Sequence, residues 1–261
     1  MNISSKSKKF FVGFNWKMNP NTLSQAQELF QIYDNLNFDQ LRFLPVVFVP
    51  SLYLSTVQDI KSSPIGVGSQ DISAHSSGAF TGQISGQMLG SLGVGYTLIN
   101  HSETHREHQP CCRNIAKMCE QALQNQIIPI VCVSFGDLGS AKQDLETQLQ
   151  HIFDIELIAQ INKSSEVFYI ALEPILNIGS GKALGCRDID KHLLIIKNFV
   201  EQLSQSRLDQ NTNYGLLYGG SVNADNILEI GNCKLVDGFL LGGASIIPDQ
   251  ITKIYKVLTQ K

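Results

Sequence analysis

Residues 237–245 read DGFLLGGAS, a short apolar run that passes directly into a glycine-rich turn ending in serine. The run lacks the alternation of polar and apolar residues that marks a strand with one face in water. Continuous apolar character over so few residues is typical of a strand buried on both faces, as in a parallel sheet covered by helices. Residues 215–222, GLLYGGSV, show the same pattern one segment earlier.

Further runs of this kind occur along the chain ahead of these two. There are eight such runs in all, and the starts of successive runs lie 19 to 47 residues apart. This spacing brackets the roughly 30 residues of one strand–helix unit. They lie at residues 10–14, 46–49, 65–68, 96–100, 128–133, 168–172, 215–219 and 238–242.

Segments with apolar residues at helical spacing fill most of the gaps between these runs. Eight alternating units in 261 residues predict a single α/β domain over residues 1–261, a (β/α)8 barrel of eight parallel strands. A doubly wound sheet is disfavoured, because eight units suit a barrel and no G-x-G-x-x-G motif follows the first strand. The clearest helices are residues 23–36 after the candidate caps Asn21 and Thr22, residues 115–123, residues 145–161, and residues 189–203 after the candidate cap Asp188.

Composition and charge exclude several classes of protein. The net charge is −3 and 43% of the residues are hydrophobic, so the chain can fill a core but lacks the excess of cations that nucleic-acid binding needs. No apolar run is long enough to span a membrane, and no apolar segment of a secretory signal follows the N-terminal lysines. We therefore predict a cytoplasmic protein with neither a nucleic acid nor a membrane as partner.

The cysteines show no spacing that identifies a metal site or a disulfide. None belongs to a C-x-x-C pair, and the pattern fits neither a zinc ribbon nor a disulfide framework. We interpret them as reduced thiols of a cytosolic protein, several of them buried. They are Cys111, Cys112, Cys119, Cys132, Cys186 and Cys233.

Chemically useful side chains follow several of the predicted strands, at ends that meet on one rim of a barrel. Asn15 and Lys17 follow the first strand, His101 and Glu103 follow the fourth, and Glu173 follows the sixth. The seventh and eighth strands run into glycine-rich turns, where backbone N–H groups can approach a phosphate without a Cβ in the way. The predicted ligand is a small anion that carries one phosphate.

A third glycine-rich segment, IGSGK at residues 178–182, follows Glu173. It lacks the spacing of a Walker loop, and we interpret it as a mobile lid that brings one more N–H to the anion. Nothing in the sequence reads as a dinucleotide or other cofactor site. The stretch HSETHREH resembles a metal cluster, but His101 ends a strand while His105 and His108 fall in the turn beyond it, so no metal site is predicted.

Seven motifs, taken in order, resemble those of the triosephosphate isomerase family over residues 11–254. The resemblance implies a TIM barrel that interconverts dihydroxyacetone phosphate and D-glyceraldehyde 3-phosphate through an enediolate, in glycolysis and gluconeogenesis, without a cofactor. It also implies a homodimer in which the segment from Gln70 to Ser85 reaches into the partner. The motifs are NWKMN (15–19), GAFTG (78–82), HSE (101–103), EP (173–174), IGSGK (178–182), YGGSV (218–222) and DGFLLGGAS (237–245).

The resemblance assigns roles on the rim that are long established for this family. Glu173 is the base that moves a proton between adjacent carbons, and His101 donates to the enediolate oxygens. Lys17 supplies a fixed positive charge, a preorganised electrostatic contribution, and the Asn15 amide binds near the substrate carbonyl. The residues that would hold the substrate and its phosphate are Asn15, Lys17, Gly179, Ser221, Gly242 and Gly243.

The chain departs from the family pattern in two coordinated groups. Gln83 and Thr104 replace a glutamate and an arginine that pair across the family's dimer interface, and losing both avoids leaving one charge unpaired. Leu172, Leu176 and Phe135 replace a tyrosine, a tryptophan and a glutamate that form a hydrogen-bonded latch at the lid hinge. We predict that an apolar contact has replaced this latch, so that the chemistry is retained and the lid motion is retuned.

Two other functions compete with this one. A phosphate-binding barrel could keep ligand affinity without turnover, and another barrel enzyme could act on a phosphorylated sugar. An aldolase-type barrel needs a Schiff-base lysine after the sixth strand, where this chain has Glu173. Turnover of glyceraldehyde 3-phosphate, compared with that of a Glu173→Asp variant, separates these functions.

Overall fold

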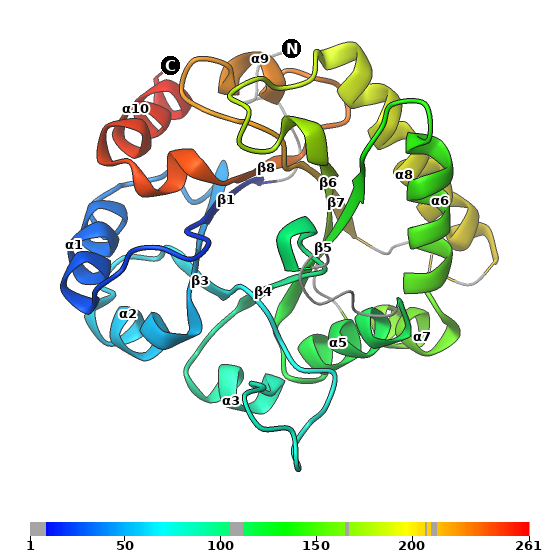
Figure 1. Cartoon of the computed structure of the whole chain (residues 1–261), viewed down its shortest axis with the longest axis horizontal. Coiled ribbons are helices and arrows are strands. Elements are labelled where there is room, and N and C mark those ends of the chain that lie inside the picture. Colours follow the sequence, from blue (N-terminus) through cyan, green and yellow to red (C-terminus); the bar gives the residue numbers. More distant parts are fainter. Residues whose placement is uncertain (1–8, 105–111, 165–166, 207, 210–212, 261) are drawn as a thin grey trace.

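A computed structural model describes residues 9–104, 112–164, 167–206, 208–209 and 213–260. In this part of the chain, eight strands lie side by side in sequence order, and β1 closes the sheet by pairing with both β2 and β8 (Figure 1). Every one of these pairs is parallel. The predicted (β/α)8 barrel is confirmed.

The strands coincide with the apolar runs of the sequence to within three residues at either end. Most of their residues are buried on both faces of the sheet, as the lack of alternation predicted. The strands are β1 (Phe10–Asn15), β2 (Phe43–Val49), β3 (Gly66–Ser69), β4 (Tyr96–Ile99), β5 (Ile128–Phe135), β6 (Phe168–Pro174), β7 (Tyr214–Tyr218) and β8 (Gly238–Leu241).

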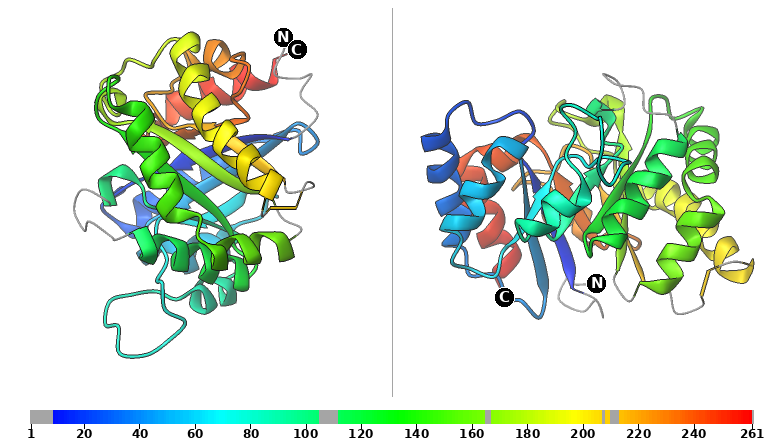
Figure 2. Two further views of the ribbon diagram at one scale, coloured as in Figure 1. Left: turned by 90° about the vertical axis from the view of Figure 1, so that its right-hand side faces the viewer. Right: turned by 90° about the horizontal axis from the view of Figure 1, so that it is seen from below.

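Helices surround the barrel, and Figure 2 shows them covering it from two sides. Helix α1 begins at the predicted place, because Oγ1 of Thr22 accepts the N–H of Gln25 at 3.3 Å. None of the helices that the structure describes is long and apolar enough to cross a membrane. The helices are α1 (Leu23–Asp34), α2 (Leu54–Ile60), α3 (Gly86–Ser91), α5 (Cys112–Gln124), α6 (Ala141–Ile152), α7 (Ile155–Lys163), α8 (Cys186–Ser206), α9 (Ile227–Gly231) and α10 (Pro248–Thr259).

Two helix predictions are wrong at their boundaries. Residues 145–161, predicted as one helix, lie in α6 and α7, because Asp154 adopts an extended conformation and its carboxylate caps α7 by accepting the Leu157 N–H at 2.8 Å. The apolar stripe continues across this break, so periodicity alone does not reveal it. Helix α8 begins at Cys186, so Asp188 lies in its first turn and not at the cap position before it.

The centre of the barrel is filled with side chains. Phe11 lies among them, with its ring centroid 4.6 Å from that of Tyr169 and 6.1 Å from that of Tyr96. A second and larger apolar layer fills the space between the strands and the helices. Because the interior is filled, a ligand has to bind on the rim of the barrel.

The interpretation of the cysteines as reduced thiols is wrong for two of them. Cys186 and Cys233 form a disulfide with an S–S distance of 2.05 Å. They lie 47 residues apart and meet only because the start of α8 packs beside the segment after α9, which the spacing of cysteines does not show. Cys119 and Cys132 are free and buried, as predicted, and the side chains of the other two cysteines lie outside the described part of the chain.

Candidate active site

The predicted site residues gather on the rim formed by the carboxyl ends of the strands. A cavity of about 360 Å³ opens there, between the ends of β1, β4 and β6 and the turns after β7 and β8. Its lining includes every residue that the sequence assigned to catalysis or to substrate binding. These residues are Asn15, Lys17, His101, Glu173, Gly179, Ser221, Gly242 and Gly243.

Glu173 is the carboxylate of this cavity, and it is only 1% exposed. It lies near the end of β6, where Pro174 passes the chain to the segment above the rim. One of its oxygens accepts the backbone N–H of Ser102 at 2.7 Å, and the other lies 3.0 Å from Nε2 of His101. Two groups that follow β4 therefore fix the position of this buried carboxylate.

His101 is held in one tautomer by its neighbours. The backbone N–H of Glu103 donates to Nδ1 of the ring at 3.3 Å. A ring nitrogen that accepts a hydrogen bond carries no proton, so the proton of the neutral ring lies on Nε2. The Nε2–H donates to Glu173 in this structure and can donate to another oxygen that takes its place.

Lys17 is anchored at both its backbone and its side chain. Its φ of 55° lies in the left-handed region, which is uncommon for a residue with a side chain. The Lys17 N–H donates to Oδ1 of Asn15 at 2.9 Å, and its carbonyl accepts from the side-chain amide of Gln70 at 2.8 Å. Its Nζ lies 2.5 Å from a carboxylate oxygen of Glu103, so a fixed positive charge borders the cavity.

Gln70 is a site residue that sequence reasoning missed. Its Nε2 also lies 3.3 Å from Oδ1 of Asn15 and 3.2 Å from the carbonyl oxygen of Phe48, so one amide group joins the ends of three strands. The amide supplies its two N–H donors without adding a charge. Gln70 directly follows β3, so inspection of the residue after every predicted strand would have found it.

The segment between β6 and α8, residues 175–185, contains the predicted lid, and we call it the lid. It lies against the turn after β7, where the Gly181 N–H donates to Oγ of Ser221 at 3.2 Å. The Ser221 hydroxyl donates in turn to the carbonyl of Asn177. The hydroxyl of Ser221, a residue predicted to hold the phosphate, is therefore engaged by the lid in this conformation.

Tyr218 is a second residue that sequence reasoning missed. The N–H of Leu184, near the end of the lid, donates to the Tyr218 hydroxyl oxygen at 2.9 Å. Burial raises the pKa of Tyr218 to about 12, so the hydroxyl stays neutral near pH 7. A Cβ on Gly220 would lie 2.2 Å from this hydroxyl oxygen, which is too close for any side chain. The turn after β7 therefore needs glycine at this position.

Among the residues that the structure describes, no group of three or more histidine, cysteine, aspartate and glutamate side chains could hold a metal ion. His105, Glu107 and His108 of the HSETHREH stretch lie outside those residues. His101 contacts Glu173 and the backbone of Glu103.

Known proteins are similar to this chain in sequence. A sequence model of the triosephosphate isomerase family matches residues 10–258. The chain belongs to the triosephosphate isomerase family. The triosephosphate isomerase of Coprinopsis cinerea is 30% identical over 247 residues, which cover 93% of this chain and 96% of the relative. Those of Delftia acidovorans and Francisella tularensis are each 33% identical over 244 residues, which cover 92% of this chain and 94% and 93% of the relatives.

Family membership confirms the family predicted from the motifs and, with it, an isomerase that acts on triose phosphates. The residues that replace the family's polar latch are arranged differently from the prediction. Leu172 and Phe135 are buried, but Leu176 is 73% exposed, so the apolar contact predicted for Leu176 is wrong for this conformation. Leu176 lies in the short turn Ile175–Asn177 and is turned to solvent, while the Phe135 ring packs on His192 of α8 at 4.7 Å.

Proposed function

We propose that this member of the family interconverts dihydroxyacetone phosphate and D-glyceraldehyde 3-phosphate through an enediolate, with Glu173 as the base. The observation that carries the proposal is the 3.0 Å contact between the Glu173 carboxylate and Nε2 of His101 in the rim cavity. A base beside a neutral donor is what proton transfer next to a carbonyl needs. The glycine turns after β7 and β8 line the same cavity, where a phosphate can bind.

Isomerisation moves the carbonyl along the substrate by one carbon. Glu173 takes a proton from the carbon next to the carbonyl, and the carbonyl oxygen becomes the oxyanion of an enediolate. His101 stabilises that oxygen through its Nε2–H. The proton then returns from Glu173 to the neighbouring carbon while the hydroxyl proton passes to the other oxygen, so the substrate gains and loses no atoms.

A substrate oxygen has to replace Glu173 as the acceptor of the His101 proton. In this structure the carboxylate is held by His101 and by the N–H of Ser102. Once His101 donates to the substrate, Glu173 loses one of its two donors and can turn toward the substrate carbon. Lys17, whose Nζ is held by Glu103, stabilises the negative charge that develops nearby. Asn15 accepts from Lys17 through Oδ1, which leaves its Nδ2 as the donor to the substrate.

The phosphate end of the substrate lies, in this proposal, among the glycine-rich segments. Gly179, Ser221, Gly242 and Gly243 supply backbone N–H groups there, and all of them line the cavity. The lid covers this end and excludes water, which protects the enediolate from losing its phosphate. The contacts of Gly181 and Leu184 with the β7 turn support this closing role.

Turnover of D-glyceraldehyde 3-phosphate by the parent and by a Glu173→Asp variant tests the proposal. Shortening the side chain withdraws the base by about one methylene, and we expect kcat to fall about 100-fold with a small change in KM. A Glu146→Asp variant on the exposed face of α6 is the matched control and should leave both constants unchanged. Ligand binding without turnover in the parent would favour a phosphate-binding barrel. Equal activity of parent and Glu173→Asp would contradict the assignment of the base.

We also propose a homodimer formed through the segment from Gln70 to Ser85. This segment extends away from the barrel between β3 and α3 (Figure 1, cyan; Figure 2), and residues 75–83 are all exposed. Oε1 of Gln83 accepts from the Ser73 hydroxyl at 2.5 Å, so Gln83 is used within its own segment. Light scattering of the purified protein should give twice the mass of the chain. A single-chain mass at every concentration would contradict the dimer.

A single domain over residues 1–261 and a cytoplasmic location stay predictions. One cooperative unfolding transition, seen alike by fluorescence and circular dichroism, would support the single domain. Fractionation of cells that produce the protein tests the location. The Cys186–Cys233 disulfide counts against a cytoplasmic location, because persistent disulfides are rare in the cytoplasm.

A further inference from the structure

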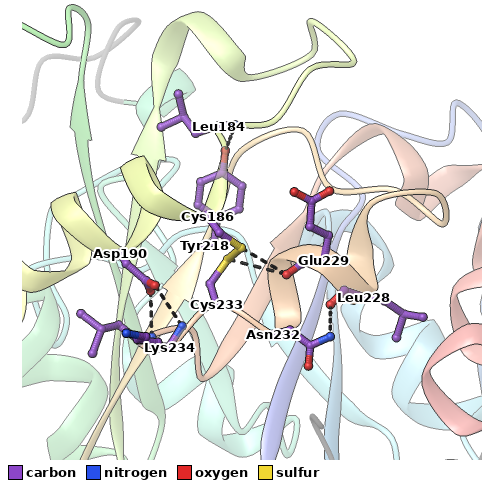
Figure 3. The surroundings of a disulfide bond; sticks show 10 residues. Leu184, Cys186, Asp190, Tyr218, Leu228, Glu229, Asn232, Cys233 and Lys234 are labelled. Atoms are coloured by element: carbon purple, nitrogen blue, oxygen red, sulfur yellow. Dashed lines mark hydrogen bonds between the residues drawn. A yellow bond between two sulfur atoms is a disulfide. The ribbon is translucent and has the colours of Figure 1, made fainter. Parts of the chain in front are cut away.

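The Cys186–Cys233 disulfide joins the start of α8 to the segment after α9. Cys186 is the first residue of α8 and directly follows the lid. Cys233 follows α9, which comes after the turn that carries Ser221. Figure 3 shows the disulfide beneath Tyr218 and Leu184, beside the carbonyl of Glu229.

We propose that Cys186–Cys233 is a reversible thiol–disulfide modification site, at which reduction loosens the far end of the lid and weakens substrate binding. The inference rests on the proposed role of the lid in covering the substrate. Its chemistry is exchange with a small dithiol or with a dithiol protein.

The coupling between disulfide and lid follows from their closeness along the chain. Leu184, which donates to the Tyr218 hydroxyl, is only two residues before Cys186, and glycine is the residue between them. In the oxidised state the Cα atoms of Cys186 and Cys233 are held 5.3 Å apart. The disulfide therefore fixes Cys186, the residue at which the lid ends, relative to Cys233. After reduction, Gly185 and Cys186 are free to move, and the hydrogen bond from Leu184 to Tyr218 forms only if these two residues become ordered.

A separate contact keeps α8 in place when the disulfide opens. The Asp190 carboxylate, one turn further along α8, accepts the backbone N–H groups of Lys234 at 3.1 Å and Leu235 at 2.9 Å (Figure 3). The body of the helix thus stays docked on the segment after α9. The effect of reduction is confined to the first turn of α8 and to the lid.

The two sulfurs differ in access to a reductant. Cys186 is partly exposed, whereas Cys233 is only 3% exposed. A thiolate of the dithiol attacks Sγ of Cys186, the S–S bond breaks, and Cys233 leaves as a thiolate that takes a proton from water. The second thiol then attacks the mixed disulfide and releases Cys186, so the dithiol is oxidised to its own disulfide by two electrons.

In the reduced state, both thiols have a hydrogen-bond acceptor nearby. The carbonyl oxygen of Glu229 lies 3.3 Å from Sγ of Cys186 and 3.7 Å from Sγ of Cys233. Sulfurs in a disulfide carry no proton, so these contacts become hydrogen bonds only after reduction. The free thiols of Cys119 and Cys132 are buried, and burial raises the pKa of both, so among the described cysteines exchange is directed to the disulfide.

Steady-state kinetics of the full chain test the inference in both redox states. Oxidised protein and protein reduced with dithiothreitol are compared, with the state of the pair checked by alkylation and mass spectrometry. We expect KM for D-glyceraldehyde 3-phosphate to rise about 5-fold on reduction, a typical size for coupling between two sites. A Cys186→Ser, Cys233→Ser double variant keeps every other cysteine and should show the high KM with or without dithiothreitol.

Hydrogen exchange of the unliganded protein gives a readout that does not depend on activity. Amides of residues 178–185, which exchange by local opening, should exchange faster after reduction, whereas amides of residues 190–200 in α8 should change only as far as the loss of overall stability accounts for. Equal exchange of the lid in both states, equal KM in both states, or an equal response of the double variant to dithiothreitol would each overturn the inference. A parent without turnover in either state would contradict the proposed function alone, since the exchange rates would still report on the lid.

Discussion

Gln70 holds two residues of the rim cavity, Asn15 and Lys17, through one side-chain amide. Its Nε2 holds the Lys17 carbonyl and Oδ1 of Asn15, while the Lys17 backbone keeps its left-handed conformation. In a Gln70→Glu variant, a carboxylate would face these oxygens without a proton to donate. We expect the free energy of unfolding to fall by about 1–3 kcal/mol, measured by urea denaturation, and kcat/KM to fall with it.

The control for this variant is Gln87→Glu on the exposed surface of α3, which adds the same charge away from the rim. It should leave stability and activity as in the parent. If Gln70→Glu behaved like the control, the hydrogen bonds of Gln70 would have no part in placing Lys17.

The residues that line the rim cavity could be predicted from the sequence, because the end of a parallel strand places a side chain on the rim whatever surrounds it. Glu173 and His101 are of this kind. Tyr218 acts by accepting a hydrogen bond from the lid, and a tyrosine in an apolar run carries no mark of that contact. The exposure of Leu176 depends on the direction in which the backbone turns after Pro174. The apolar side chain of Leu176 does not reveal that direction.

Among the secondary structure elements, the break between α6 and α7 depends on one carboxylate. Asp154 accepts the Leu157 N–H and begins α7 in a new direction. We expect an Asp154→Ala variant to lose about 1 kcal/mol of unfolding free energy, as is usual for an N-cap. Urea denaturation measures this loss. Asp59→Ala on exposed α2 is the matched control, and an equal stability of the two variants would show that the cap is dispensable.

Strands and helices differ in what the sequence reveals about their ends. The strands stand out because burial on both faces makes them largely apolar, and a polar residue, a glycine or a proline marks the end of each run. The stripe of α6 continues into α7, so hydrophobic spacing joins two helices that the Asp154 cap separates. The disulfide between the start of α8 and the segment after α9 needs the three-dimensional arrangement to become visible.

For the molecule as a whole, pH affects stability through His192, which packs on Phe135. Burial holds its pKa below the ordinary value, so the folded state takes up a proton on this ring at lower pH than the unfolded chain does. As the pH falls through about 6.5, the unfolded chain binds more protons than the folded state, so stability present above that pH is lost below it. We expect the urea midpoint to fall between about pH 7 and pH 5.5, and to fall less in His192→Gln.

The matched control is His151→Gln, since His151 is exposed on α6 and bonds only to the backbone of its own helix in the described contacts. This variant should keep the pH dependence of the parent. If His192→Gln and His151→Gln showed the same slope, the acid sensitivity would come from other groups.

The disulfide raises the free energy of unfolding because it restricts the unfolded chain. It closes a loop between residues 47 apart, which in the chain-entropy account stabilises the folded state by about 4 kcal/mol. The contacts of Asp190 with Lys234 and Leu235 remain when the bond opens, so the folded state itself changes little. The Cys186→Ser, Cys233→Ser variant should therefore unfold at lower urea than the oxidised parent and at nearly the same urea as the reduced parent. If instead it proved far less stable than the reduced parent, the serines would be disturbing the packing beside Glu229, and the loss could not be assigned to the cross-link.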